Sequence, residues 1–122
     1  MHLTRALAVV AAAAALIAVA PTALAPAAPR ASAAKSCDVG NSRSYGTTYV
    51  LSIGVSHTSC RSAKRLIRAY HACRPGKSGH CGSVKGYRCS ESRFNKGRTS
   101  YDSRVTCRKG SRTVKHTYTQ FI

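Results

Sequence analysis

The sequence predicts an α+β fold in which one amphipathic helix packs on a small, mainly antiparallel sheet, in the order strand, helix, strand, strand, strand, stabilised by disulfides. Three observations support this prediction. An alternating apolar segment precedes a segment with helical periodicity, extended patterns then resume between glycine-containing turns, and six cysteines are available for cross-links. A chain of 122 residues with an Ala-rich N-terminal stretch holds at most one such domain.

The first strand is predicted over residues 49–55, where apolar side chains alternate with smaller or polar ones. Residues 56–59 supply side chains that start helices, and residues 60–74 change to a helical period that Pro75-Gly76 ends. Successive helical residues lie about 100° apart and so separate into two arcs. The apolar arc, expected to face the sheet, holds Cys60, Ala63, Leu66, Ile67, Tyr70 and Cys73, and the opposite arc holds Arg61, Lys64, Arg65 and Arg68.

Three further strands are predicted over residues 84–93, 103–108 and 113–121. The turns between them contain Asn95-Lys96-Gly97 and Lys109-Gly110-Ser111, which tolerate positive φ, so consecutive antiparallel hairpins are the simplest connection. A hairpin centred on Arg98 places Cys89 opposite Cys107, and both are expected to face the helix beside Cys60.

The N-terminus has the pattern of a signal peptide. His2 and Arg5 precede an unbroken apolar run over residues 6–20, which is shorter than the roughly 20 residues of a membrane-spanning helix. We expect residues 1–34 to be the signal peptide, with cleavage near Ala33 or Ala34, and no integral membrane anchor. Residues 35–48 are an N-terminal extension with Cys37, residues 49–122 are the single α+β domain, and the protein is expected to be secreted and extracellular or associated with the cell wall.

All six cysteines follow the predicted signal peptide, at Cys37, Cys60, Cys73, Cys81, Cys89 and Cys107. An oxidising destination and a small core favour three disulfides. The spacing contains no Cys-x2-Cys or His-x3-His pair, so no metal site is expected. Cys73 and Cys81 form the most favoured pair, because they flank a short Pro- and Gly-containing loop. Cys60 is expected to join the helix to the sheet through Cys107 or Cys89, with Cys107 preferred, leaving the other for Cys37.

Three runs resemble a pattern that recurs in small secreted actinobacterial proteins of unknown function: Cys60-x-x-Ala63, Gly86-Tyr87-Arg88-Cys89 and Val105-Thr106-Cys107-Arg108-x-Gly110. The resemblance covers residues 50–118. It implies a shared scaffold and supplies no catalytic residues.

The excess of positive charge is the strongest functional indication. The chain has 20 Lys plus Arg against 3 Asp plus Glu, a formal net charge of +17. Such a surface attracts polyanions, including wall polymers, nucleic acid and anionic surfaces, although a solvated basic surface without a ligand is the simpler alternative. The residues expected to bind are Arg61, Lys64, Arg65, Arg68, Arg104, Arg108 and Arg112, with Arg88 and Lys115 among the other cations along the hairpins. The protein is expected to be a monomer without cofactors.

Other functions remain open. A secreted ribonuclease needs a base, an acid and phosphate clamps, which Glu91, His116 and the pair Arg104 and Arg108 would supply. A single-strand nucleic-acid platform needs exposed aromatic side chains, but packing in the core is the favoured role for Tyr87, Phe94, Tyr101, Tyr118 and Phe121. An antimicrobial factor would use the cationic helix face. A proteinase inhibitor would present Lys77 on the loop between Cys73 and Cys81.

Overall fold

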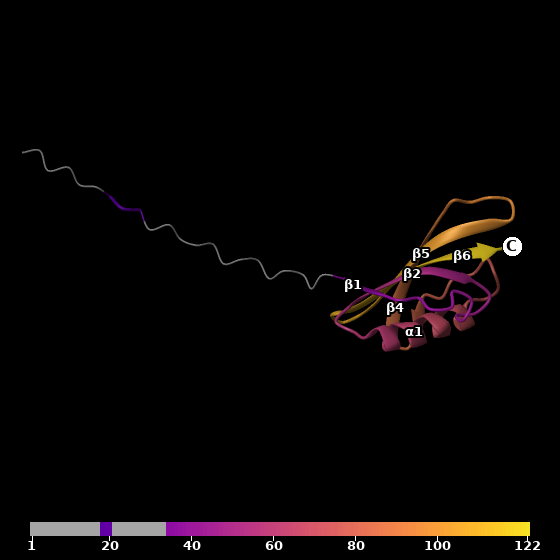
Figure 1. Ribbon diagram of the computed structural model, residues 1–122, viewed down its shortest axis with the longest axis horizontal. Coiled ribbons are helices and arrows are strands. Elements are labelled where there is room, and N and C mark those ends of the chain that lie inside the picture. The colour runs from indigo at the N-terminus through magenta and orange to yellow at the C-terminus, as the bar shows by residue number, and fades with distance from the viewer. Residues whose placement is uncertain (1–17, 21–33) are drawn as a thin grey trace, which may run out of the picture.

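The computed structural model describes residues 18–20 and 34–122. The predicted signal peptide therefore lies, apart from residues 18–20 and 34, outside the described residues. From residue 34 onward the chain forms one helix packed against one face of a six-stranded sheet (Figure 1). The α+β architecture predicted from the sequence is confirmed, but the sheet has more strands than expected.

All strand pairs in the sheet are antiparallel, and the spatial order is β1-β2-β6-β5-β4-β3. The two edges are the short strands β1 and β3. The elements are β1 Lys35–Cys37, β2 Tyr49–Ser56, α1 Cys60–Cys73, β3 Ser83–Val84, β4 Tyr87–Phe94, β5 Ser100–Lys109 and β6 Arg112–Phe121.

Helix α1 begins and ends where the sequence predicts. The Ser62 N–H donates to Ser59 Oγ at 3.1 Å, so Ser59 caps the first turn. At the other end the Arg74 N–H donates to the Tyr70 carbonyl, and Pro75 prevents continuation. The buried helix residues are Ala63, Leu66, Ile67 and Tyr70, all from the predicted apolar arc. They pack against the inner faces of the central strands in one hydrophobic core.

Two strands were not expected, and both lie at the sheet edges. Within the N-terminal extension, β1 pairs with β2, and Tyr45 is only 2% exposed, with its hydroxyl donating to the Val39 carbonyl at 2.6 Å. Strand β3 exists because Lys85 and Gly86 both adopt positive φ, which folds the expected strand over residues 84–93 into a tight hairpin. Residues 35–48 are thus part of the sheet and the core.

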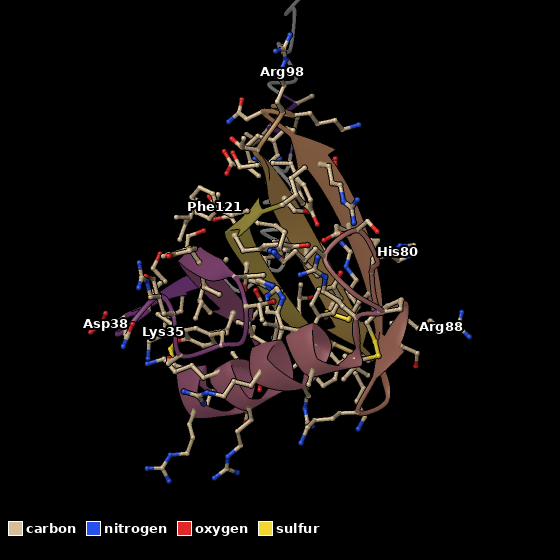
Figure 2. The ribbon with its side chains drawn as sticks, turned by 90° about the vertical axis from the view of Figure 1, so that its right-hand side faces the viewer. Lys35, Asp38, His80, Arg88, Arg98 and Phe121 are labelled. Atoms are coloured by element: carbon tan, nitrogen blue, oxygen red, sulfur yellow. A yellow bond between two sulfur atoms is a disulfide. The ribbon has the colours of Figure 1, made fainter. Side chains whose placement is uncertain are left out.

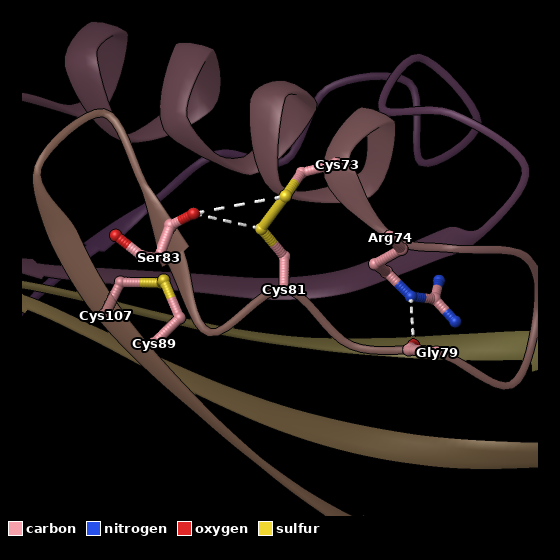
Figure 3. The surroundings of a disulfide bond; sticks show 7 residues. All are labelled: Cys73, Arg74, Gly79, Cys81, Ser83, Cys89 and Cys107. Atoms are coloured by element: carbon pink, nitrogen blue, oxygen red, sulfur yellow. Dashed lines mark hydrogen bonds between the residues drawn. A yellow bond between two sulfur atoms is a disulfide. The ribbon is translucent and has the colours of Figure 1, made fainter.

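The predicted hairpin register is confirmed, because Cys89 lies directly opposite Cys107 on β4 and β5. These two residues form a disulfide, and Cys60 bonds to Cys37, so the expected link from Cys60 to Cys107 is wrong. The reason is proximity: Cys107 already has a facing cysteine on the neighbouring strand, whereas β1 places Cys37 beside the first residue of α1. The expected Cys73–Cys81 disulfide is present and ties the end of α1 to the chain that leads into β3 (Figure 3).

The first prediction concerns the disulfide that the sequence missed. Replacing Cys37 and Cys60 together by serine should lower the free energy of unfolding by about 3.5 kcal/mol, because that bond closes the longest loop, with a sequence separation of 23. The Cys73→Ser/Cys81→Ser variant, with a separation of 8, should lose about 2.5 kcal/mol. Urea unfolding measures both. A smaller loss for the Cys37 and Cys60 pair than for the control pair would contradict the assignment of β1 as an integral strand.

Candidate functional site

The sheet has one face packed against α1 and one face that no described element covers. Side chains alternate between the two faces along each strand, and the exposed positions of β4, β5 and β6 point to the uncovered side. We call this side the open face. Its cations are Arg88, Arg104, Arg108 and Lys115, all exposed. Figure 2 shows Arg88 projecting away from the body of the molecule.

Small hydroxyl side chains fill most other positions of the open face. Strand pairing arranges them in rows across the sheet: Thr117 lies opposite Arg104 on one side and Ser52 on the other, and the Ser52 and Thr117 hydroxyls are 2.5 Å apart. The hydroxyl-bearing residues are Ser52, Ser56, Ser90, Ser92, Thr106, Thr113, Thr117 and Thr119. The face is therefore polar, cationic and rich in hydrogen-bonding groups.

The open-face cations have no acidic partners. Among the described residues the only ion pair joins Arg93 to Glu91, at 3.2 Å, on the helix side of the sheet. Asp102, the acid of the open face, accepts hydrogen bonds from Thr119 and Asn95, and these bonds lower the pKa of its carboxyl group. Arg88 and Arg108 lie directly opposite each other, an arrangement of like charges that destabilises a sheet unless an anion compensates it.

The cations predicted from the sequence are divided among three places. Arg104 and Arg108 share the open face, as expected for alternate residues of one strand. The predicted cationic arc of α1 lies on the opposite side of the molecule, where Lys64 is half-buried and Arg68 is partly engaged: its Nε donates to the Ser44 carbonyl, and its guanidinium stacks on Tyr45. Arg112 is on neither surface.

Arg112 instead lines a hollow of about 440 Å³ beside the start of α1. Arg65 from the helix and Lys85 from the β3–β4 turn lie around the same hollow. Thus the seven predicted binding residues do not form one continuous surface, and the pairing of strands, which the sequence does not specify fully, adds Arg88 and Lys115 to the open face.

The residues of the ribonuclease alternative are not brought together. Glu91 and His116 lie on the helix side of the sheet, where the Glu91 side chain is 4% exposed and His116 is 1% exposed. Arg104 and Arg108 project from the other face. The proposed base and acid are therefore separated from the proposed phosphate clamps by the sheet itself.

Beneath the end of α1 the structure buries a polar cluster centred on Arg74, a residue that no sequence pattern singles out. The Arg74 guanidinium donates to Gln120 Oε1 at 3.1 Å and to the Tyr101 hydroxyl at 2.8 Å. It also donates to the carbonyls of Gly79 and Lys77, at 2.9 and 2.8 Å. One charged group thereby joins the helix end, the following loop and two strands. Figure 3 shows the bond from Arg74 to Gly79.

The same bonds determine the geometry of the loop proposed for proteinase inhibition. The Lys77 side chain is exposed, but its carbonyl accepts hydrogen bonds from Arg74 and Tyr101 and so points inward. An inhibitor presents this carbonyl to the oxyanion hole of its target. Hydrogen bonds from Arg74 and Tyr101 hold the loop with the Lys77 carbonyl turned inward, so the loop does not offer that group.

Two histidines, the half-buried His71 and the buried His116, lie next to Arg74. His71 Nε2 and His116 Nε2 are 3.1 Å apart, and His116 Nδ1 is buried without a hydrogen-bond partner among the described residues. Burial, with a further contribution from the Arg74 charge, lowers the pKa of His71 to about 4. Burial also lowers the pKa of His116 well below its usual range, and the neighbouring His71 and Arg74 add to the effect. Both imidazoles are neutral at pH 7.

Glu91 occupies the other side of this cluster. Tyr118 donates its hydroxyl to Glu91 Oε1, and Arg93 contacts Oε2. Burial and the nearby Glu91 charge raise the pKa of Tyr70 to about 12. Burial and the bond to Glu91 also raise the pKa of Tyr118, so both tyrosines are neutral. Glu91, Tyr118 and Arg93 are thus bonded to one another within the fold, whereas the buried Tyr70 hydroxyl has no hydrogen-bond partner among the described residues.

The aromatic side chains follow the prediction in part. Tyr87, Tyr101 and Tyr118 are buried, as expected for core residues. Phe94 is 36% exposed, beneath the Arg104 guanidinium, and Phe121 is 51% exposed at the end of β6. The described part of the chain contains no group of three His, Cys, Asp or Glu residues placed to hold a metal ion. Within that part, no helix has the length and apolar character that crossing a membrane requires.

These observations define a small disulfide-linked α+β domain whose uncovered sheet face is cationic and rich in hydroxyl groups. Comparisons with protein-family models, curated protein sequences and solved structures find no match to this chain.

The second prediction is acid lability caused by the histidine pair. Because the pKa values of His71 and His116 are lower in the folded than in the unfolded protein, the unfolded state binds more protons as the pH falls. Stability should be full above the unfolded pKa of about 6.5 and should decline as the pH falls to about 4, with a loss on the order of 2 to 3 kcal/mol. Urea unfolding at pH 7 and pH 4.5 measures the loss.

A double variant, His71→Gln/His116→Gln, should show a shallower dependence of stability on pH between these values. His80→Gln, which changes an exposed loop histidine, is the matched control and should retain the wild-type dependence. Identical pH profiles for the double variant and the wild type would remove the histidine pair as the cause.

Proposed function

We propose that this protein is a secreted, non-enzymatic binder of polyanions, and that it binds them on the open face. The observation that supports this most directly is the set of four exposed cations on one uncovered sheet face without an acidic partner. Two of them, Arg88 and Arg108, lie opposite each other on neighbouring strands. Their like charges destabilise this strand pair unless an anion lies between them. A phosphate or carboxylate polymer supplies several such anions at once.

Location outside the cytoplasm is part of the proposal. All the cysteines of the chain are paired in the three disulfides, which persist in oxidising compartments. A wall polymer, nucleic acid or an anionic surface would then be the available partner. Insertion of α1 into a membrane is disfavoured, because its apolar residues Leu66 and Ile67 are already buried against the sheet.

The third prediction compares two variants that each remove four positive charges. The open-face variant is Arg88→Gln/Arg104→Gln/Arg108→Gln/Lys115→Gln, and the helix-face variant is Arg61→Gln/Lys64→Gln/Arg65→Gln/Arg68→Gln. Binding to labelled inorganic polyphosphate and to labelled single-stranded RNA is measured by fluorescence anisotropy from low salt to about 0.15 M. The open-face variant should lose on the order of 10- to 100-fold in affinity, and the slope of log affinity against log salt should fall by about 3.

The helix-face variant reports the effect of net charge alone and should change much less. Equal losses in the two variants would mean that binding has no preferred surface, and a larger loss in the helix-face variant would assign binding to α1. Absence of binding by the wild type at about 0.15 M salt would reject the proposed function.

The same RNA probe tests the enzymatic alternative. Cleavage by the wild type that either Glu91→Gln or His116→Ala abolishes, with folding confirmed by circular dichroism, would replace the binder with a ribonuclease. We expect a salt-sensitive increase in the anisotropy of the RNA probe without cleavage of the RNA.

A further inference from the structure

The open face contains two adjacent hollows that meet at Gly54. One has a volume of about 240 Å³ and is lined by Arg104, Lys115 and hydroxyl residues that include Ser52 and Thr117. The other, of about 150 Å³, is lined by Arg108, Lys115 and hydroxyl residues that include Ser56 and Thr113. Lys115 and Gly54 border both. Each hollow therefore combines one arginine, the shared lysine and hydroxyl groups from at least two strands.

Gly54 makes the hollows by leaving out a side chain. It lies opposite Lys115 in the middle of β2, between the positions of Ser52 and Ser56. A Cβ atom added here would meet only the Lys35 carbonyl oxygen, at 3.9 Å, which is an ordinary contact, and the backbone has no positive φ. Local backbone geometry therefore does not require glycine, although glycine weakens a strand. The contribution of glycine at this position is the open space that its missing side chain leaves on the open face.

The spacing of the hollows suits a chain of phosphodiesters. Their hydroxyl pairs, Ser52 with Thr117 and Ser56 with Thr113, lie on either side of Lys115. Thr113 and Thr117 are each two residues from Lys115, and two residues of strand span about 7 Å. An extended chain in which three carbons join successive phosphates has a repeat of this order. A polyol phosphate and single-stranded nucleic acid both contain such a link, so spacing alone does not choose between them.

The residues that line the hollows favour the polyol phosphate over single-stranded nucleic acid. Recognition of single-stranded nucleic acid uses aromatic side chains on which bases stack. No aromatic side chain other than that of His116, which is buried on the helix side, belongs to the residues lining either hollow. Hydroxyl and cationic groups remain, and these suit a phosphate chain whose links carry hydroxyl groups and no base.

We propose that the paired hollows around Gly54 bind a polyol phosphate polymer, with Arg104 and Arg108 each holding one phosphate and Lys115 holding the phosphate between them. This inference rests on the proposed function, because it names the class of polyanion that the open face prefers. The threonine and serine hydroxyls bond to the polyol link, which gives a preference over polymers of equal charge that lack hydroxyls at this position.

The fourth prediction uses Gly54→Val, which fills both hollows without changing the charge. The probes are labelled poly(glycerol phosphate) and oligouridylate with the same number of phosphates, at about 0.15 M salt. The wild type should bind poly(glycerol phosphate) at least tenfold more tightly than oligouridylate. The Gly54→Val substitution should lower the affinity for poly(glycerol phosphate) at least tenfold and leave the affinity for oligouridylate nearly unchanged. The thermal midpoint of Gly54→Val should be unchanged or higher, because valine favours strands.

Two further variants separate the causes. Thr113→Val/Thr117→Val keeps shape and charge but removes two hydroxyls, and it should lower affinity for poly(glycerol phosphate) severalfold. Gly82→Val, at a glycine where an added Cβ meets nothing within 4 Å, is the matched control and should bind as the wild type does.

The outcomes distinguish this inference from the proposed function. Equal or tighter binding of oligouridylate by the wild type, or undiminished binding of poly(glycerol phosphate) by Gly54→Val, would overturn the inference. If the open-face charge variant still loses affinity in that case, the proposed function stands. If neither polymer binds the wild type, both fail.

Discussion

The buried guanidinium of Arg74 is the interaction on which the placement of α1 depends. It joins the helix end to β5 through Tyr101, to β6 through Gln120, and to the loop that follows the helix. Its charge is not neutralised by a carboxylate in direct contact. Carbonyl oxygens, side-chain oxygens and the ring of Tyr118, 5.0 Å away, surround it instead. Burial holds the two histidines beside it neutral, and the permanent charge of Arg74 adds to this effect, which links helix docking to pH.

Docking of α1 on one side divides the charges of the sheet into two groups with different environments. On the helix side, Glu91 and Arg93 form an ion pair, Tyr118 donates to Glu91, and the Arg74 guanidinium donates to several oxygens. On the open face the cations have solvent and hydroxyl groups around them. A single helix covers only one face of a sheet, so the part of the chain that the structure describes leaves the other face uncovered. The side chains on that face determine what it can bind, and on this face the charged side chains that extend into solvent are cationic.

Periodicity was enough to predict the helix, the central strands and the hairpin register that pairs Cys89 with Cys107. It failed at the edges for physical reasons. Strand β1 has 3 residues, too few to show an alternation, and is held by pairing and by the bond from Cys37. Strand β3 depends on the positive φ of Lys85, a residue type that does not indicate a turn. The open face was predictable in part: Arg104 and Arg108 alternate along one strand, but Arg88 and Lys115 join them through strand order. Arg74 gave no signal, since an arginine after a helix is usually solvated.

The two edge strands also determine how copies of the protein behave when crowded. Unpaired strand edges can pair with the edge of another sheet. Here the edge strands β1 and β3 have only 3 and 2 residues, Lys35 belongs to β1, and Lys85 directly follows β3. The net charge of +17 on the full chain makes copies repel one another. If the proposed function holds, a polyanion that neutralises this charge brings many copies together and removes that repulsion. Short, lysine-bearing edges then favour a coat of separate molecules along the polymer over a fibre of fused sheets.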